Sequence, residues 1–161
     1  MGSLVLILAT AIQITLAPKL VVFGASPDFV LLAIAWLTIH LSAEQASVVG
    51  FIGGVLQGGV ADAKMAAYVV SRVLAGVTSA IVGKSTLAAT PLTVLASGFA
   101  SSAVGSVLFL LFGAQPNFWA SVWSALGTTI YNTIIFGTVS ALISKRLVRA
   151  GSSGSAKMRR P

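Results

Sequence analysis

The residues that could do chemistry are few and widely separated along the chain. The sequence contains three acidic residues, one histidine and no cysteine. The lack of cysteine excludes thiol chemistry and thiolate-ligated metals, and the acids and histidine are too few for a metal cage or an acid–base pair. No Gly-rich phosphate loop, His-Glu-x-x-His or Gly-x-Ser-x-Gly motif occurs. We therefore expect no catalytic residue, no metal and no cofactor, and a function that is not enzymatic.

Four polar side chains interrupt segments that are otherwise apolar. Gln13, Gln57 and Asn132 cannot remain unpaired in hydrocarbon. We expect each to hydrogen-bond between helices, with a substrate contact as the alternative. Arg72 is the most unusual residue, because a cation within an apolar segment is costly. We expect it to reach the interface or to pair with Asp62 or another polar group, and a role in binding a partner or ligand is the alternative.

The composition is that of an integral membrane protein. Of the 161 residues, 57% are hydrophobic and only 8% are charged, and the mean hydropathy is +0.99. Soluble domains carry about 25% charged residues, so this chain cannot build a fully water-facing surface. We expect an all-α integral membrane protein, folded as a compact bundle of about six transmembrane helices.

The apolar segments and the turns between them define six expected helices. They cover residues 4–23, 28–41, 46–60 and 66–82, and two more spans, joined by a hairpin at 113–117, lie in the 60 uncharged residues between Lys84 and Lys145. The second and third segments are short for full crossings, so a tilted or partly re-entrant hairpin is a further possibility for them. Five spans are the alternative count.

Prolines mark both ends of the first connection. Pro18 and Lys19 should kink the first helix or end it. Asp28 follows Pro27 directly, and an acid at this place should cap the free N–H groups of the second helix. The first segment lacks a basic region before Leu4, so we expect no cleaved signal peptide.

Basic residues set the expected orientation. Six of the ten follow the last span, at Lys145, Arg146, Arg149, Lys157, Arg159 and Arg160. Cytoplasmic segments are enriched in Lys and Arg, so we expect the C-terminus in the cytoplasm and, with six spans, the N-terminus as well. Residues 1–145 then form the helical bundle, and residues 146–161 form a basic, flexible tail that can rest on anionic membrane lipid. Nucleic acid is not an expected partner, because the charges flank a membrane helix.

Small residues recur on one face of several expected helices. The stripes are Gly50, Gly54 and Gly58 in the third helix, Ser97, Ser101 and Gly105 in the fifth, and Thr129, Thr133, Gly137 and Ala141 in the sixth. Helices associate in lipid through close packing, which such faces permit. We expect these faces to pack helices within the bundle, with docking of another protein's transmembrane helix as the alternative.

The order of features from Gln13 to Lys145 resembles the bacterial rod shape-determining protein MreD family. The resemblance lies in Gln13 of the first helix, in Pro27-Asp28 before Phe29-Val30-Leu31-Leu32, and in Gly50-Phe51-Ile52-Gly53-Gly54-Val55-Leu56-Gln57 after a short polar turn. Family members usually have an aspartate closing the third helix, where this chain has Gln57-Gly58. Asp62 lies four residues later.

This resemblance implies a non-enzymatic scaffold of the bacterial cell-elongation complex, which supports lateral peptidoglycan synthesis and cell shape. It implies residence in the cytoplasmic (inner) membrane and binding to an MreC-type single-span protein. A RodA-type glycosyltransferase, its transpeptidase and MreB-type filaments are the further implied partners. A chain with almost no mass outside the membrane agrees with a scaffold role.

The main alternative is the substrate-binding membrane subunit of an energy-coupling factor type transporter. Such subunits are also basic, six-helix chains of about this size. The polar residues expected to line a ligand pocket are few, and the loops are short for a substrate lid. A bare channel is a weaker alternative, because no segment resembles a selectivity filter.

Overall fold

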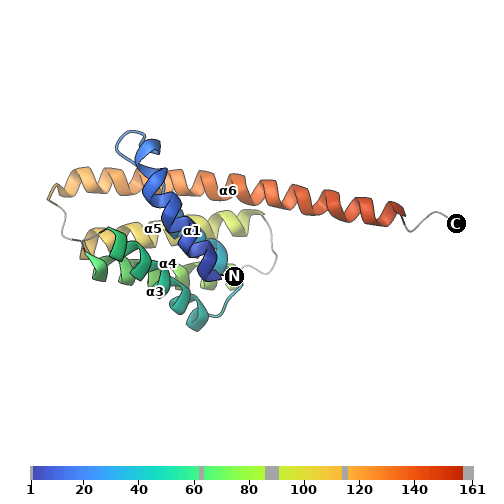
Figure 1. Cartoon of the computed structure of the whole chain (residues 1–161), viewed down its shortest axis with the longest axis horizontal. Coiled ribbons are helices and arrows are strands. Elements are labelled where there is room, and N and C mark those ends of the chain that lie inside the picture. Colours follow the sequence, from blue (N-terminus) through green and yellow to red (C-terminus); the bar gives the residue numbers. More distant parts are fainter. Residues whose placement is uncertain (1, 62–63, 86–90, 114–115, 158–161) are drawn as a thin grey trace.

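A computed structural model describes residues 2–61, 64–85, 91–113 and 116–157, with side chains in the last helix described as far as Leu142. The described residues form six α-helices and one short 3₁₀-helix, and no β-strand (Figure 1). The elements in chain order are α1 (Gly2–Thr15), η1 (Ala17–Leu20), α2 (Phe29–Thr38), α3 (Ala43–Val60), α4 (Met65–Ser85), α5 (Pro91–Phe112) and α6 (Phe118–Lys157). The expectation of an all-α bundle is confirmed.

The first connection follows the prolines, as expected. α1 ends at Thr15, and Pro18 lies within the first turn of η1, where its missing N–H is not needed. A tight turn follows, in which Phe23 and Gly24 have φ angles of 51° and 80°. This turn directs the chain back toward the bundle, where α2 begins at Phe29.

α2 is the central helix of the bundle. It contacts all five other α-helices, and its side chains from Val30 to Ala35 are largely buried. The helix has only 10 residues, so it is about 15 Å long and shorter than the expected segment 28–41. The structure confirms that Asp28 is its N-cap. The carboxylate of Asp28 therefore lies where α2 begins within the bundle.

α3 and α4 form a tightly packed hairpin. A Cβ atom added at Gly54 would lie 2.6 Å from the Cα of Val69, and one at Gly50 would lie 2.7 Å from the Cα of Val73. The contact at Gly58 is looser, since an added Cβ would lie 3.0 Å from the Cα of Met65. The glycine stripe thus faces α4. It allows the two helix backbones of the same chain to approach closely.

The second small-residue stripe also lies inside the bundle. The Ser97 hydroxyl on α5 is 2.8 Å from the Ser79 hydroxyl on α4, and the Ser101 hydroxyl donates to the Ala75 carbonyl at 3.0 Å. Gly105, one turn further along α5, faces Leu31 and Ala75. These contacts hold α5 against α4 through small polar side chains.

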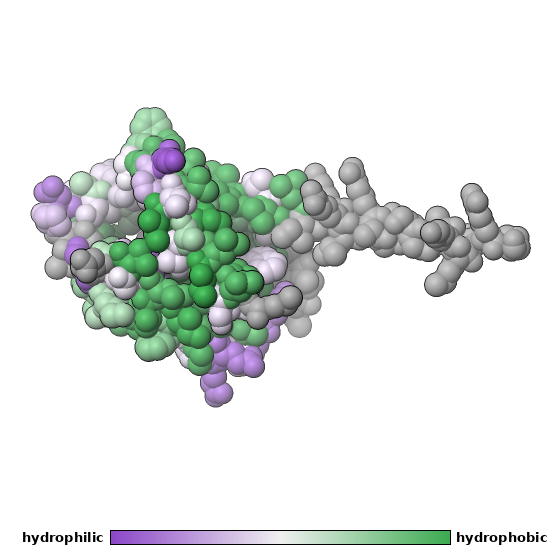
Figure 2. Space-filling view, viewed as in Figure 1, coloured by the Kyte–Doolittle hydropathy of each residue, from purple (hydrophilic) through white to green (hydrophobic). Residues whose placement is uncertain are grey.

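Three described helical segments are long and apolar enough to cross a membrane, namely Met65–Lys84, Leu92–Phe112 and Phe118–Leu142. The face shown in Figure 2 is mainly hydrophobic, with hydrophilic residues at its periphery. α1 and α2 have 14 and 10 residues, whereas a straight crossing needs about 20. Six crossings therefore remain a prediction.

α6 differs from the expectation for the end of the chain. We expected a flexible tail from residue 146, but the helix continues to Lys157 and extends well past the bundle (Figure 1). No proline occurs between Pro116 and Pro161, so nothing in this stretch removes a backbone donor or clashes with the preceding turn. Residues 158–161 of the expected tail lie outside the described residues.

Candidate functional site

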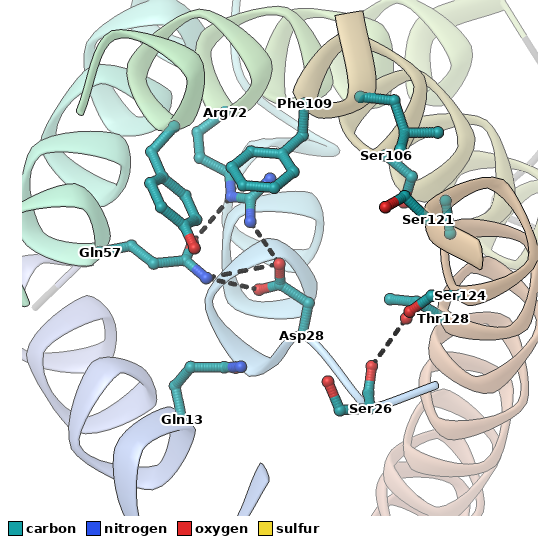
Figure 3. Close-up of a pocket in the computed structure, with 13 residues that line it drawn as sticks. Gln13, Ser26, Asp28, Gln57, Arg72, Ser106, Phe109, Ser121, Ser124 and Thr128 are labelled. Atoms are coloured by element: carbon teal, nitrogen blue, oxygen red, sulfur yellow. Dashed lines mark hydrogen bonds and ion pairs between the residues drawn. The ribbon is translucent and has the colours of Figure 1, made fainter. Parts of the chain in front are cut away.

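A polar cavity of about 270 Å³ lies at one end of the bundle. At this end α1, α3 and α5 finish, and α2, α4 and α6 begin. Figure 3 shows its two walls, with charged and amide side chains on one side and hydroxyl side chains on the other. The lining residues are Gln13, Ser26, Asp28, Gln57, Tyr68, Arg72, Ser106, Phe109, Leu110, Ser121, Ser124, Ala125 and Thr128.

The start of α2 lies on the side of the cavity that carries the charged and amide side chains (Figure 3). The first N–H groups of a helix have no partner within that helix, and burial makes this costly. The Phe29 N–H donates to Gln13 Oε1 at 2.6 Å, and the Leu31 N–H donates to Asp28 Oδ1 at 3.0 Å. The Asp28 N–H donates to Asn132 Oδ1 at 2.9 Å. Residues from α1 and α6 therefore complete the cap of α2.

A buried ion pair joins α2 to α4. The Arg72 guanidinium binds Asp28 Oδ2, and the Arg72 side chain is only 4% exposed, compared with 15% for Asp28. Arg72 Nε also donates to Gln57 Oε1 at 2.8 Å. The Gln57 amide donates to both Asp28 oxygens, at 3.3 and 3.4 Å. Each member of this triad contacts the other two, which satisfies the buried charges.

Aromatic rings cover the guanidinium side of the triad. The Arg72 guanidinium carbon lies 5.4 Å from the centre of the Tyr68 ring, within the range of a cation–π contact. The Tyr68 ring is tilted against Phe109 of α5, with the ring centres 4.7 Å apart. Arg72 also donates to the Ser71 hydroxyl at 3.2 Å.

The opposite wall consists mainly of hydroxyl groups on α6. Ser124 donates to the Gly24 carbonyl at 2.8 Å, and Thr128 donates to the Ser26 carbonyl at 3.0 Å. Both bonds fasten the turn that precedes α2 to α6. Each hydroxyl oxygen keeps lone pairs that can accept a hydrogen bond from a ligand.

The structure brings together five of the polar residues singled out in the sequence: Gln13, Asp28, Gln57, Arg72 and Asn132. It pairs Arg72 with Asp28, in agreement with the expectation that Arg72 pairs with Asp62 or another polar group. Asp62 lies outside the described residues. No residue of the glycine stripe of α3 or the serine stripe of α5 lines the cavity. Their sequence neighbours Gln57 and Ser106 do.

Tyr68, Ser124 and Thr128 belong to the site but were not singled out in the sequence, because hydroxyl side chains are common in packed helices. The spacing of Ser121, Ser124 and Thr128 places them on one face of α6, which is the signal that could have revealed the wall.

The chemistry available at this site is binding. Its single cation and single anion are joined to each other, so the cavity has no uncompensated charge among the described residues. No group of three or more His, Cys, Asp or Glu residues is placed to hold a metal ion in the described part of the chain.

Fold and site together define an all-helical bundle with a polar cavity at one end and three segments of membrane-spanning length and apolarity. No protein-family model, curated protein or solved structure matches the chain.

Proposed function

We propose that the chain is an MreD-type membrane scaffold of the bacterial cell-elongation complex. One observation carries this proposal. The separate segments on which the sequence resemblance depends meet in space. The Gln13 amide donates to the Pro27 carbonyl and accepts the Phe29 N–H, and the Gln57 amide donates to Asp28. Residues that share a family pattern and also form one buried network favour a common fold over a chance similarity.

The proposed scaffold is a multi-pass protein of the bacterial cytoplasmic membrane, with both termini in the cytoplasm. It binds an MreC-type single-span protein and associates with a RodA-type glycosyltransferase, its transpeptidase and MreB-type filaments. The glycine stripe of α3 and the serine stripe of α5 face α4. A partner helix therefore binds the outer faces of the bundle, where Phe51 and Val107 are exposed.

The test is a gentle affinity purification of the tagged full chain from its native membranes, with the co-purifying proteins identified. We expect a single-span protein with a periplasmic domain, together with wall-synthesis enzymes. A tagged membrane protein of similar size and unrelated function, purified in parallel, is the control. Recovery of neither class above this control would overturn the proposal.

The cavity favours a second candidate, the substrate-binding subunit of an energy-coupling factor type transporter. The sequence offered few polar residues for a ligand pocket, but the fold gathers two amides, an ion pair and several hydroxyls around about 270 Å³. Small-molecule sites combine such a concave space with a few placed polar groups. Recovery of ATP-binding cassette subunits in the same purification would establish this function in place of the scaffold.

A further inference from the structure

The polar cavity has features that identify the chemistry of a ligand. Its hydroxyls offer both kinds of hydrogen bond: Ser124 and Thr128 have used their O–H groups, and their oxygens can still accept. Ser121, the third hydroxyl of this wall on α6, forms no side-chain hydrogen bond within the described residues, so its O–H is able to donate (Figure 3). A ligand that fits this wall has groups that both donate and accept, as hydroxyl groups do.

The opposite wall selects against a charged ligand. The Arg72 guanidinium and the Asp28 carboxylate are already bound to each other, and Gln57 contacts both. A charged ligand would lose its hydration without gaining an unpaired counter-ion, and breaking the buried pair would be costly. An uncharged ligand can contact this wall and leave the triad intact.

The rest of the cavity lining is apolar, with two aromatic rings beside Leu110 and Ala125, and the volume of the cavity limits the size of the ligand. Phe109 and Tyr68 present ring surfaces beside the polar groups, and positively polarised C–H groups are attracted to such faces. The volume of about 270 Å³ is slightly below the roughly 300–1,000 Å³ typical of pockets for drug-sized ligands. The space therefore suits a small polar group of about one ring.

A second cavity of about 180 Å³ adjoins the first and is more apolar. The two cavities share Gln13, Gln57 and Tyr68 in their linings, and the second continues along Ile14 of α1 and Val60 of α3. Ile14 and Val60 are exposed on this side, so it would face lipid in a membrane. An acyl chain attached to the polar group would therefore have a neighbouring apolar space.

We propose that the polar cavity binds an uncharged, hydroxyl-rich group, the chemistry shared by a free sugar and the headgroup of a glycolipid. The two complementary walls and the aromatic cover carry this inference. It does not depend on the scaffold assignment, because the protein partners named above can bind whether or not the cavity is filled.

The experiment measures thermal unfolding of the full chain in lipid nanodiscs made from phosphatidylcholine and phosphatidylglycerol. One arm titrates glucose, with glucuronate and glucosamine as charged counterparts of the same ring. The other arm adds monoglucosyl diacylglycerol to the bilayer, with diacylglycerol lacking the sugar as its control. Stabilisation by glucose indicates a free sugar, whereas stabilisation by the glycolipid alone indicates a headgroup.

Two matched substitutions on α6 locate the binding site. Ala125→Phe places a ring in the cavity, whereas Ala120→Phe adds the same ring on the exposed surface of the same helix. We expect the half-saturating concentration of the stabilising probe to rise at least about tenfold for Ala125→Phe and to stay unchanged for Ala120→Phe. No stabilisation by either uncharged probe, equal stabilisation by the charged rings, or equal binding by the two variants would overturn the proposal.

Discussion

At Asp28 a single carboxylate caps one helix and neutralises a cation on another. Oδ1 accepts the Leu31 N–H, while Oδ2 binds Arg72, so the two contacts use different oxygens. Gln57 contacts both oxygens and the guanidinium. A neutral amide fits at this position because a second carboxylate beside Asp28 would leave two negative charges facing the single positive charge of Arg72.

Removing the charge of Arg72 should destabilise the fold strongly. Arg72→Gln leaves the Asp28 carboxylate buried without its counter-ion, which typically costs about 3–5 kcal/mol. Thermal unfolding in detergent measures the change, and Lys84→Gln, at an exposed position on α4, is the control. Asp28→Asn keeps an oxygen that can cap α2, so the double variant Asp28→Asn/Arg72→Gln should be less destabilised than the sum of the two single changes. Additive effects would contradict the pairing.

Asn132 should matter through the backbone of α2. Its Oδ1 accepts the Asp28 N–H, and the residue is fully buried. Asn132→Leu keeps a similar volume but leaves that N–H unsatisfied, at a cost of about 1–3 kcal/mol in the free energy of unfolding. Thr138→Val removes a hydroxyl that bonds only within α6 and serves as the control. Equal melting temperatures for the two variants would show that Asn132 has no such role.

At the scale of elements, sequence and structure agree where local signals decide. Pro18 ends α1 and Asp28 caps α2, as expected. Ser42 with Gln45 forms a capping box, which was not predicted and which starts α3 at Ala43, before the expected residue 46. The joining of Asp28 to Arg72 is different, because 44 residues separate them and no periodicity connects the two positions. Such a pairing depends on how helices are arranged, which a single sequence does not specify.

The α3–α4 interface gives a prediction at this scale. Gly54→Ala should lower the melting temperature, because its Cβ would lie 2.6 Å from the backbone of Val69 and the helices would have to separate. Gly59→Ala is the matched control on α3, since nothing lies within 4 Å of the added atom there. We expect Gly59→Ala to be neutral or slightly stabilising, by up to about 1 kcal/mol, because alanine favours a helix more than glycine does. If Gly54→Ala left stability unchanged and reduced only partner recovery, the stripe would instead be an intermolecular surface.

At the scale of the whole molecule, the ends of the bundle differ in chemistry. The cavity, the start of α4 and the start of α6 lie at one end, whereas Lys84 lies near the other, toward which α6 runs with its basic residues. The excess of basic residues predicts that the Lys84 end faces the cytoplasm. The cavity would then open on the outer side of the membrane, where extracellular or periplasmic ligands can reach it.

The chain has no cysteine, so single introduced cysteines can test this orientation directly. Asn117 is exposed just before α6, at the cavity end, and Lys84 is exposed near the end of α4. In right-side-out membrane vesicles, a membrane-impermeant maleimide should label Asn117→Cys at once and Lys84→Cys only after permeabilisation. The expected pattern follows from the six-span prediction with a cytoplasmic N-terminus. Three helices cross before α4 and five before α6, so both helices begin outside, at the cavity end. The reverse labelling pattern would place the polar cavity and the apolar cavity beside it on the cytoplasmic side, and it would contradict the orientation inferred from the basic residues.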